Sequence, residues 1–401
     1  MSGETAGTAG TRNGGLDLVR TVAVLSVAGF HAAWFGVLGG QGDAPGWLPP
    51  VGGIAVETFY ALSGFLIGRI LLRVSDDPSL SAWLRFMGRR WARTLPLYYC
   101  VLLTVAFLVG PPAGELTRYA TMTQNLFRPP DPSLFEGLMG TSWSLAVEEV
   151  FYLTFSVALL GACASAGKRA TWPVILMFVA LPAAARVAAP SLGMGVPYYT
   201  AVLNLDGIAW GVALAALEAR GSVLFRHPVV AAAAGTLMVA AAWLPYATGA
   251  LDTVASWQPG SLTLAAAGCC LVLSGSLRVT VPGPVGIAVR AVAARSYSIY
   301  LIHLPVLNAV GKAHANGAIG FPAAVAAFLC LTAGLSWAAH RWVEVPGMAI
   351  PGKLRELSAA GFPQHQGDQN SGGSPGPGRT GFPPADGFPM DAEQASQAPP
   401  G

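Results

Sequence analysis

The sequence predicts an all-α integral membrane protein, with about ten transmembrane helices in one bundle and a disordered C-terminal tail. Its 401 residues are 53% hydrophobic and only 11% charged, and the mean hydropathy is +0.52. Soluble domains, by comparison, carry about 25% charged residues. Apolar stretches recur along most of the chain, each close to the roughly 20 residues that a helix needs to cross a bilayer.

The chain divides into three parts by composition. Residues 1–15 are polar and Gly-rich, which predicts a disordered N-terminus without a cleavable signal peptide. Residues 16–350 form the transmembrane domain. Residues 351–401 are rich in Gly, Pro, Gln and Ser, too polar to bury a core, so we expect a disordered cytoplasmic tail. The expected spans lie near residues 16–38, 52–72, 95–112, 141–162, 171–189, 198–218, 228–247, 259–277, 293–311 and 318–340.

Positive charge is distributed unevenly between these spans. With ten spans and an inward N-terminus, most of the Lys and Arg residues between spans fall on one side, which predicts cytoplasmic termini and a multi-pass protein of the inner (plasma) membrane of a bacterium. The same asymmetry accounts for the net charge of +3, so nucleic acid is not an expected partner. The five cysteines lack metal-ligand spacing, and no metal site is expected.

The first span contains a cation and a titratable imidazole on one face. Arg20 and His31 are eleven residues apart, which on an α-helix is about three turns, or roughly 16 Å along the axis. Ionisable groups inside a membrane are costly and mark functional sites. The alternative is an arginine that extends to the membrane interface and an unrelated histidine packed in the bundle.

The second span carries Glu57 near its outer end and Ser63-Gly64 at its middle. Glu57 is either a partner for an intramembrane cation or an interfacial carboxylate facing water. Ser63-Gly64 alternatively forms a small-residue contact between helices. The segment that follows, residues 80–99, places Arg85, Arg89 and Arg93 at four-residue spacing among aromatic residues. This pattern predicts an amphipathic helix on the membrane surface, which binds either lipid headgroups or a polyphosphate ligand.

Two later spans carry further candidates. The fourth opens with TSWSLAVEEVFYL, in which Ser144, Glu148 and Tyr152 share one helical face, although a glutamate there also stabilises a helix N-terminus. The ninth contains SYSIYLIHLPV, in which Tyr300 and His303 are neighbours at i, i+3. A hydrogen bond between helices is the structural alternative for His303.

The order and wording of these motifs resemble the membrane acyltransferase 3 family over residues 15–350. The motifs are LDLVR followed ten residues later by His, VETFYALSGFLI, RRWARTLPLYY, TSWSLAVEEVFYL, SYSIYLIHLPV and RWVEVP. The resemblance implies a ten-helix bundle that transfers an acyl group, often acetyl, from a coenzyme A thioester to a hydroxyl of a sugar, glycan or sugar-bearing metabolite. It implies roles for the residues that match family motifs, namely Arg20, His31, Arg90, Arg93, Trp143, Ser144, Glu148, Tyr300 and His303.

The sequence departs from the family pattern at two places. Ala55 replaces a glycine that commonly precedes the acidic residue of the second span. Asn204 stands where relatives often have an arginine, two positions before Asp206. The second difference leaves Asp206 without its usual cationic neighbour and puts its role in doubt.

The residues suggest a mechanism for this transfer. We expect His31 to act as the general base, with its tautomer held by Glu148 or Glu57, while Arg20 binds phosphate or orients the thioester carbonyl. The reaction is either a direct transfer or a covalent relay through His31 or Ser63. No cofactor is expected to be bound permanently, and acyl-CoA (acetyl-CoA) is the co-substrate. The expected donor-binding residues are Arg89, Arg90, Arg93, Ser63, Trp143 and Ser144.

Two functions of other classes remain open on the sequence. A proton-coupled transporter or exporter of a sugar or lipid would also use intramembrane His, Glu and Asp residues, but the two halves of the chain show no internal repeat. A sensor or scaffold would use the tail to recruit partners. The acceptor itself is open among a cell-wall glycan, an exopolysaccharide, a glycolipid and a glycosylated antibiotic.

Overall fold

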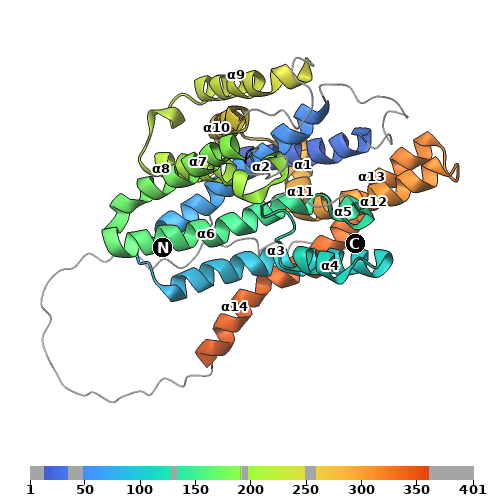
Figure 1. Ribbon diagram of the computed structural model, residues 1–401, viewed down its shortest axis with the longest axis horizontal. Coiled ribbons are helices and arrows are strands. Elements are labelled where there is room, and N and C mark those ends of the chain that lie inside the picture. Colours follow the sequence, from blue (N-terminus) through green and yellow to red (C-terminus); the bar gives the residue numbers. More distant parts are fainter. Residues whose placement is uncertain are drawn as a thin grey trace, which may run out of the picture.

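The computed structural model describes residues 13–34, 48–127, 133–189, 191, 197–248 and 259–360, and these residues form helices and turns without a strand. Figure 1 shows α1 and α2 in the middle of the bundle, α9 and α10 along one side, and α3 with α6 along the other. The α-helices are α1 (Gly14–Trp34), α2 (Leu48–Val74), α3 (Leu80–Val109), α4 (Ala113–Ala120), α5 (Leu134–Met139), α6 (Ser142–Ala166), α7 (Thr171–Ala188), α8 (Leu205–Ala219), α9 (Pro228–Ala247), α10 (Pro259–Ser276), α11 (Gly283–Ala294), α12 (Ser296–Ala315), α13 (Phe321–Ala339) and α14 (Val345–Ala360).

Short helical turns connect several of these helices. A π-helical turn, η6, joins α13 to α14 without a break in the helix. The short turns are η1 (Gly167–Ala170), η2 (Pro197–Tyr199), η3 (Ala201–Leu203), η4 (Val223–Phe225) and η6 (His340–Glu344).

The all-α membrane fold is confirmed, whereas the count of about ten spans is not. Six apolar helical segments of the described chain are long enough to cross a membrane, and a seventh is obtained if α11 and α12, bent by 69°, form one span. One of the six, Ser142–Ala188, contains both α6 and α7. The predicted sixth span is short because η2 and η3 occupy its beginning, which leaves α8 with 15 residues. Such a helix is about 22 Å long, less than the hydrocarbon thickness of a bilayer.

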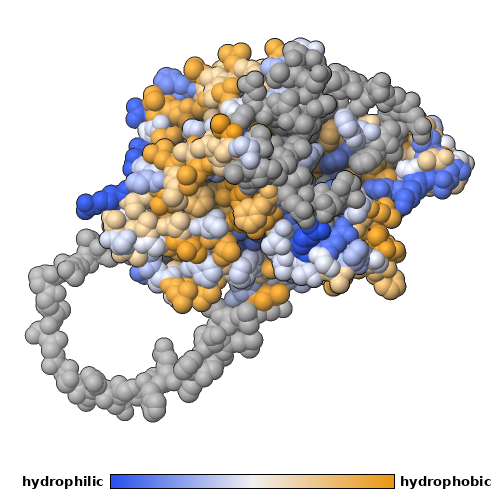
Figure 2. Space-filling model, viewed as in Figure 1, coloured by the Kyte–Doolittle hydropathy of each residue, from blue (hydrophilic) through white to orange (hydrophobic). Residues whose placement is uncertain are grey.

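Apolar side chains cover much of the outer surface, as expected of a multi-pass membrane protein. Figure 2 shows hydrophobic residues over much of the coloured surface, with hydrophilic residues at its left and right ends and in a patch near its lower middle. Phe107 on α3 is 89% exposed and Val229 on α9 is 79% exposed. In water such a surface would be unfavourable, whereas in a bilayer it faces lipid chains.

Glycines allow α2 and α8 to pack backbone against backbone. A Cβ added at Gly64 would lie 1.9 Å from the carbonyl oxygen of Ile208, and one at Gly211 would lie 2.3 Å from that of Ala61. Gly64 is therefore a small-residue contact between helices, as one reading of the second span predicted. This contact fixes the position of α2, which carries Glu57 and Ser63 on different faces.

The C-terminal region remains helical past the predicted domain boundary. α14 continues through residue 360, so the first ten residues of the predicted tail are helical. Gly347 of this helix packs on α3, where an added Cβ would lie 2.6 Å from the carbonyl oxygen of Ala92. That carbonyl has no amide donor from position 96 because Pro96 lacks an N–H group. Of the predicted disordered N-terminal segment 1–15, residues 14 and 15 already belong to α1, so this boundary was wrong. Residues 1–12, the rest of the predicted tail and the end of the first predicted span lie outside the described residues.

Candidate active site

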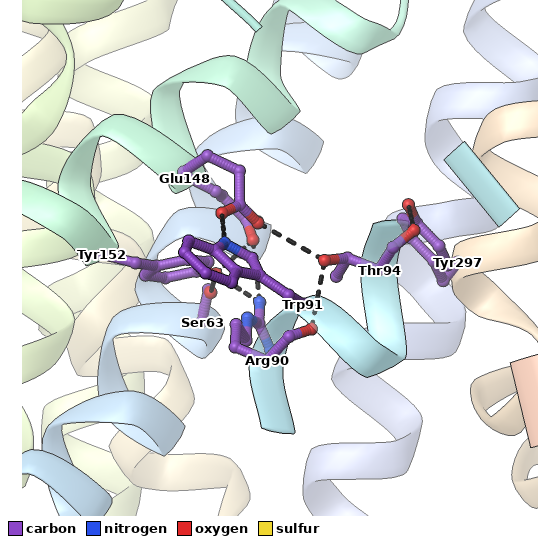
Figure 3. Close-up of polar contacts among 8 residues, drawn as sticks. Ser63, Arg90, Trp91, Thr94, Glu148, Tyr152 and Tyr297 are labelled. Atoms are coloured by element: carbon purple, nitrogen blue, oxygen red, sulfur yellow. Dashed lines mark hydrogen bonds and ion pairs between the residues drawn. The ribbon is translucent and has the colours of Figure 1, made fainter. Parts of the chain in front are cut away.

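Arg90, Glu148, Tyr152 and Ser63 form a hydrogen-bonded cluster where α2, α3 and α6 meet (Figure 3). Arg90 donates to Glu148 Oε2 at 3.0 Å and to the hydroxyl of Tyr152, which itself donates to Glu148. Ser63 Oγ lies 2.5 Å from the Tyr152 hydroxyl. The Arg90 guanidinium also lies over the Tyr152 ring, 4.4 Å from its centroid. We call these four residues the Arg90 cluster.

The position of Arg90 contradicts the prediction of a surface helix over this segment. The arginine-rich residues form the N-terminal half of the long helix α3, capped by Ser79, and this half packs on α6. Trp83 Nε1 donates to Ser156 Oγ at 2.9 Å, and Trp91 Nε1 donates to Glu149 Oε2 at 3.0 Å. The four-residue spacing of Arg85 and Arg89 correctly identified an exposed face of the helix. Arg90 lies on the adjacent face, which packs against the bundle.

The three predicted donor arginines of α3 consequently differ in environment. Arg89 is exposed, Arg90 is bonded within its cluster, and Arg93 is half-buried. Within the described chain Arg93 makes no ion pair, so its charge is available to a ligand. Ser63 is bonded to Tyr152, which in turn donates to Glu148, and no histidine contacts Ser63 in the described residues.

One turn away on α6, a second contact links the cluster to α12. Ser144 Oγ lies 2.6 Å from the hydroxyl of Tyr300 and also donates to the carbonyl oxygen of Thr141 at 3.2 Å. Both side chains of the pair are buried. Because Ser144 and Glu148 are four residues apart, this pair lies about 6 Å along α6 from the Arg90 cluster.

Two histidines contact each other at the far end of this strip of polar groups. His31 Nδ1 on α1 lies 3.0 Å from His303 Nε2 on α12. His303 Nδ1 in turn lies 3.0 Å from the carbonyl oxygen of Ile299. The prediction that Glu148 or Glu57 contacts His31 was wrong. Glu148 is engaged by Arg90 and Tyr152, and Glu57 makes no hydrogen bond within the described chain.

Arg20 is half-buried on α1, eleven residues before His31. The unbroken helix keeps the two side chains on one face, and the separation of about 16 Å along the axis follows from its geometry. The neighbouring Thr21 donates to the carbonyl oxygen of Val289 at 2.9 Å, which fixes this part of α1 against α11. The guanidinium of Arg20 and the imidazole of His31 therefore belong to different levels of α1.

Asp206 has a cationic partner that the sequence interpretation missed. Arg186 at the end of α7 donates to both carboxylate oxygens of Asp206, at 2.8 and 2.6 Å, and Thr263 of α10 donates to one of them at 2.7 Å. Asn204 instead donates to the carbonyl oxygens of Tyr198 and Thr200. A lone arginine in the apolar segment before Asp206 was the signal that could have identified this pair.

A second buried polar cluster holds α12 against the π-helical turn. Glu344 accepts a hydrogen bond from Ser298, and its other oxygen lies 2.9 Å from His340 Nδ1. Tyr297, next to Ser298, donates to the carbonyl oxygen of Thr94 at 2.7 Å. These contacts fix the helix that carries Tyr300 and His303. The sequence interpretation quoted RWVEVP but gave Glu344 no role.

Glu57 and Trp143 lie beside a group of aromatic rings. Glu57 is only 2% exposed, and Tyr60 follows it one turn later on α2. Trp143 is half-buried, with its ring centroid 6.4 Å from that of Tyr60 and 4.9 Å from that of Tyr198. These tyrosines were not among the predicted site residues.

The chain is similar to a family of known proteins. A family model described as an acyltransferase domain matches residues 13–341. The exopolysaccharide production protein ExoZ of Rhizobium meliloti is 26% identical over 329 residues, covering 77% of this chain and 93% of ExoZ. The acyltransferase MdmB of Streptomyces mycarofaciens is 25% identical over 389 residues, covering 86% and 94%.

A Staphylococcus aureus protein with a provisional O-acetyltransferase name is 29% identical over 168 residues, which cover 39% of this chain and 26% of that protein. No solved structure matches the chain. These findings imply an acyl donor and a hydroxyl acceptor, and they do not favour a transporter without covalent chemistry. The chain belongs to the acyltransferase 3 family and is an acyltransferase of the membrane.

Proposed function

We propose that this acyltransferase moves an acyl group, most simply acetyl, from a coenzyme A thioester to a hydroxyl of a sugar, glycan, glycolipid or glycosylated metabolite, with His31 as the general base. The single observation that carries this assignment is the contact between His31 and His303 in the membrane bundle. Both ExoZ and MdmB are similar to this chain. Only the name of ExoZ, which refers to exopolysaccharide production, supports an acceptor that carries sugar hydroxyls.

The histidine pair determines which nitrogen of His31 can take a proton. The carbonyl oxygen of Ile299 can only accept, so His303 Nδ1 carries the hydrogen and His303 Nε2 is an acceptor. His31 Nδ1 then donates to His303 Nε2, and the backbone of Val27 also interacts with the His31 ring. The lone pair of His31 therefore lies on Nε2. His303 replaces the carboxylate that orients the histidine in a hydrolase triad.

The reaction then requires one proton transfer and one bond exchange. His31 Nε2 accepts the proton of the acceptor hydroxyl as its oxygen forms a bond to the thioester carbonyl carbon. The carbon–sulfur bond breaks, and the coenzyme A thiolate leaves and takes up the proton from His31. Products are the O-acyl ester and free coenzyme A. A direct transfer of this kind needs no nucleophilic side chain.

Arg93 and Arg89 are the proposed contacts for the donor phosphates. Guanidinium groups bind phosphate through paired hydrogen bonds, and Arg93 has no competing ion pair in the described residues. Arg90 has a different role, because its bonds to Glu148 and Tyr152 hold α3 against α6. The distance between Arg20 and His31 favours phosphate binding by Arg20 over a contact with the thioester carbonyl.

This arrangement also supports a direction for the two substrates. We propose that both termini are cytoplasmic, so that α3 begins on the cytoplasmic side, where coenzyme A is found. The thioester arm would extend from Arg93 past Ser144 and Tyr300 toward His31. The acceptor would approach from the opposite end of the bundle, where Trp143 lies.

The test is consumption of the thioester. Purified protein in lipid nanodiscs should release free coenzyme A from acetyl-CoA at a rate that rises with a sugar acceptor. His31→Ala should abolish the release while the thermal unfolding midpoint is retained. Near-normal turnover by His31→Ala would exclude His31 as the base, and a transporter would release no coenzyme A at all.

A further inference from the structure

Two polar side chains of α2 are buried without a hydrogen-bond partner. Glu57 is 2% exposed and Tyr60 is 1% exposed. Within the described chain, Glu57 Oε2 and the Tyr60 hydroxyl have no partner. A buried polar group without a hydrogen bond is costly, so these atoms need a ligand or water that supplies the missing bonds.

The neighbouring helices α7 and α8 do not supply the missing hydrogen bonds. Arg186 is the cation that interacts electrostatically with Glu57, but its guanidinium already serves Asp206, Thr263 and the carbonyl oxygen of Leu203. Gly207 faces the same place, where an added Cβ would lie 2.9 Å from Glu57 Oε2 and 3.0 Å from a ring carbon of Tyr60.

Aromatic rings lie beside Tyr60. The Trp143 ring meets Tyr60 nearly edge-on at 88°, and it contacts Tyr198 at 4.9 Å and Tyr199 at 5.2 Å between centroids. A carboxylate and a phenol beside flat apolar faces are complementary to a sugar ring, whose hydroxyls donate at its edge and whose C–H groups pack on aromatic faces.

The same tyrosine connects this place with the proposed reaction centre. Tyr60 and Glu57 both lie against Gly207 of α8, and the Tyr60 ring contacts that of Trp143, which precedes the Ser144 that is bonded to Tyr300. Phe59, adjacent to Tyr60, meets the Tyr300 ring edge-on at 5.8 Å. A ligand bound at Glu57 and Tyr60 would thus adjoin the helix that holds His303.

We propose that Glu57, Tyr60, Trp143 and Tyr198, together named the Glu57 subsite, bind the sugar ring of the acceptor. This inference rests on the proposed function. One ring hydroxyl donates to the Glu57 carboxylate and a neighbouring hydroxyl bonds to Tyr60, while the ring face packs on Trp143. These contacts orient the hydroxyl that is acylated and exclude simple alcohols, which can make only one of the bonds. Glu57 is a specificity-determining residue in this account and takes no part in proton transfer.

The experiment compares acceptors that differ by one hydroxyl. Wild-type protein in nanodiscs is supplied with acetyl-CoA and a panel of methyl glycosides, with 1-propanol as the simple alcohol. The glycoside with the highest kcat/KM is then compared with its monodeoxy analogues. Wild type should prefer the complete sugar over one analogue by about 10- to 100-fold, because that analogue leaves the buried carboxylate unpaired.

Glu57→Met, which has no hydrogen-bond acceptor oxygen, should lower kcat/KM for the complete sugar at least tenfold and treat the two sugars alike, while the KM for acetyl-CoA changes less than twofold. Glu149→Met is the matched control, since this glutamate also lies on a bundle helix but accepts from Trp91, outside the Glu57 subsite. It should keep the wild-type preference. Tyr60→Phe removes one hydroxyl and should weaken discrimination at a different ring position, which provides a second test if Glu57→Met does not fold.

Retained discrimination in folded Glu57→Met, or in Tyr60→Phe if the former does not fold, would overturn the inference. Sugars that release coenzyme A no faster than 1-propanol would also overturn it, even though the thioester is consumed. Absence of thioester consumption by the wild type would refute the proposed function first, and the inference with it.

Discussion

The histidine pair allows a quantitative prediction for His303. His303→Ala removes the acceptor for His31 Nδ1–H, at 3.0 Å in the structure. A neutral hydrogen bond contributes a net free energy of about 0.5–1.5 kcal/mol, which alone changes the tautomer ratio of His31 by up to about tenfold. General-base catalysis contributes about 10²- to 10⁴-fold, which is the ceiling for any residue that acts through His31. The tautomer ratio alone accounts for up to about tenfold, and loss of the fixed ring orientation adds to it below that ceiling, so we expect kcat to fall by about 10- to 100-fold.

The assay is steady-state release of coenzyme A with acetyl-CoA and the best sugar acceptor, and the KM for acetyl-CoA should not change. His303→Gln, whose amide oxygen can accept from Nδ1–H, should recover part of the loss. The double variant His31→Ala/His303→Ala should be no slower than His31→Ala alone, because residues that act as a unit are not additive. A double variant that is tenfold slower still, or a His303→Ala rate within twofold of wild type, would refute this reasoning.

Three further predictions concern donor binding and stability. Arg186→Met leaves a buried carboxylate unpaired and should lower the free energy of unfolding by about 3–5 kcal/mol, whereas Arg69→Met, at a partly exposed ion pair, should cost about 0–1 kcal/mol in the same denaturation assay. Arg93→Ala should raise the KM for acetyl-CoA about 10- to 100-fold and leave the acceptor KM unchanged; equal effects on both would contradict a donor role. Outside the spans, burial and the neighbouring Glu115 raise the pKa of Glu136, so the folded state holds this proton more tightly than the unfolded chain, and stability declines as pH rises above about 4.3. Glu136→Gln should flatten that decline in thermal midpoints measured between pH 4 and 8, and an unchanged slope would show that other groups cause it.

Much of the fold could be predicted from the sequence because hydrophobic length is the dominant constraint in a membrane. Each predicted apolar stretch falls on a helix of the described chain or overlaps one, apart from its masked ends. The periodicity of charged residues was a less reliable guide to burial where two faces of one helix carry charge. In α3 the exposed face of Arg85 and Arg89 predicted a surface helix, yet Arg90, one residue further, points into the bundle.

Contacts between helices could not be predicted, because spacing within one helix says nothing of its neighbours. The pairing of His31 with His303 joins positions 272 residues apart. Arg186 and Asp206 come from different helices joined by turns, and Asn204 occupies the position where a cation was expected. The predicted candidates Ser144 and Tyr300, each proposed separately, do meet, at 2.6 Å.

We propose that His31 is the base of an acyl transfer. The most direct measurement is the rate of free coenzyme A release from acetyl-CoA by protein in lipid, with and without pooled sugar acceptors, for wild type and His31→Ala side by side. The account predicts release that grows with acceptor in the wild type, disappears in His31→Ala, and is matched by an equal amount of acylated sugar in the mass spectrum. Acceptor-dependent release that persists in folded His31→Ala would contradict it.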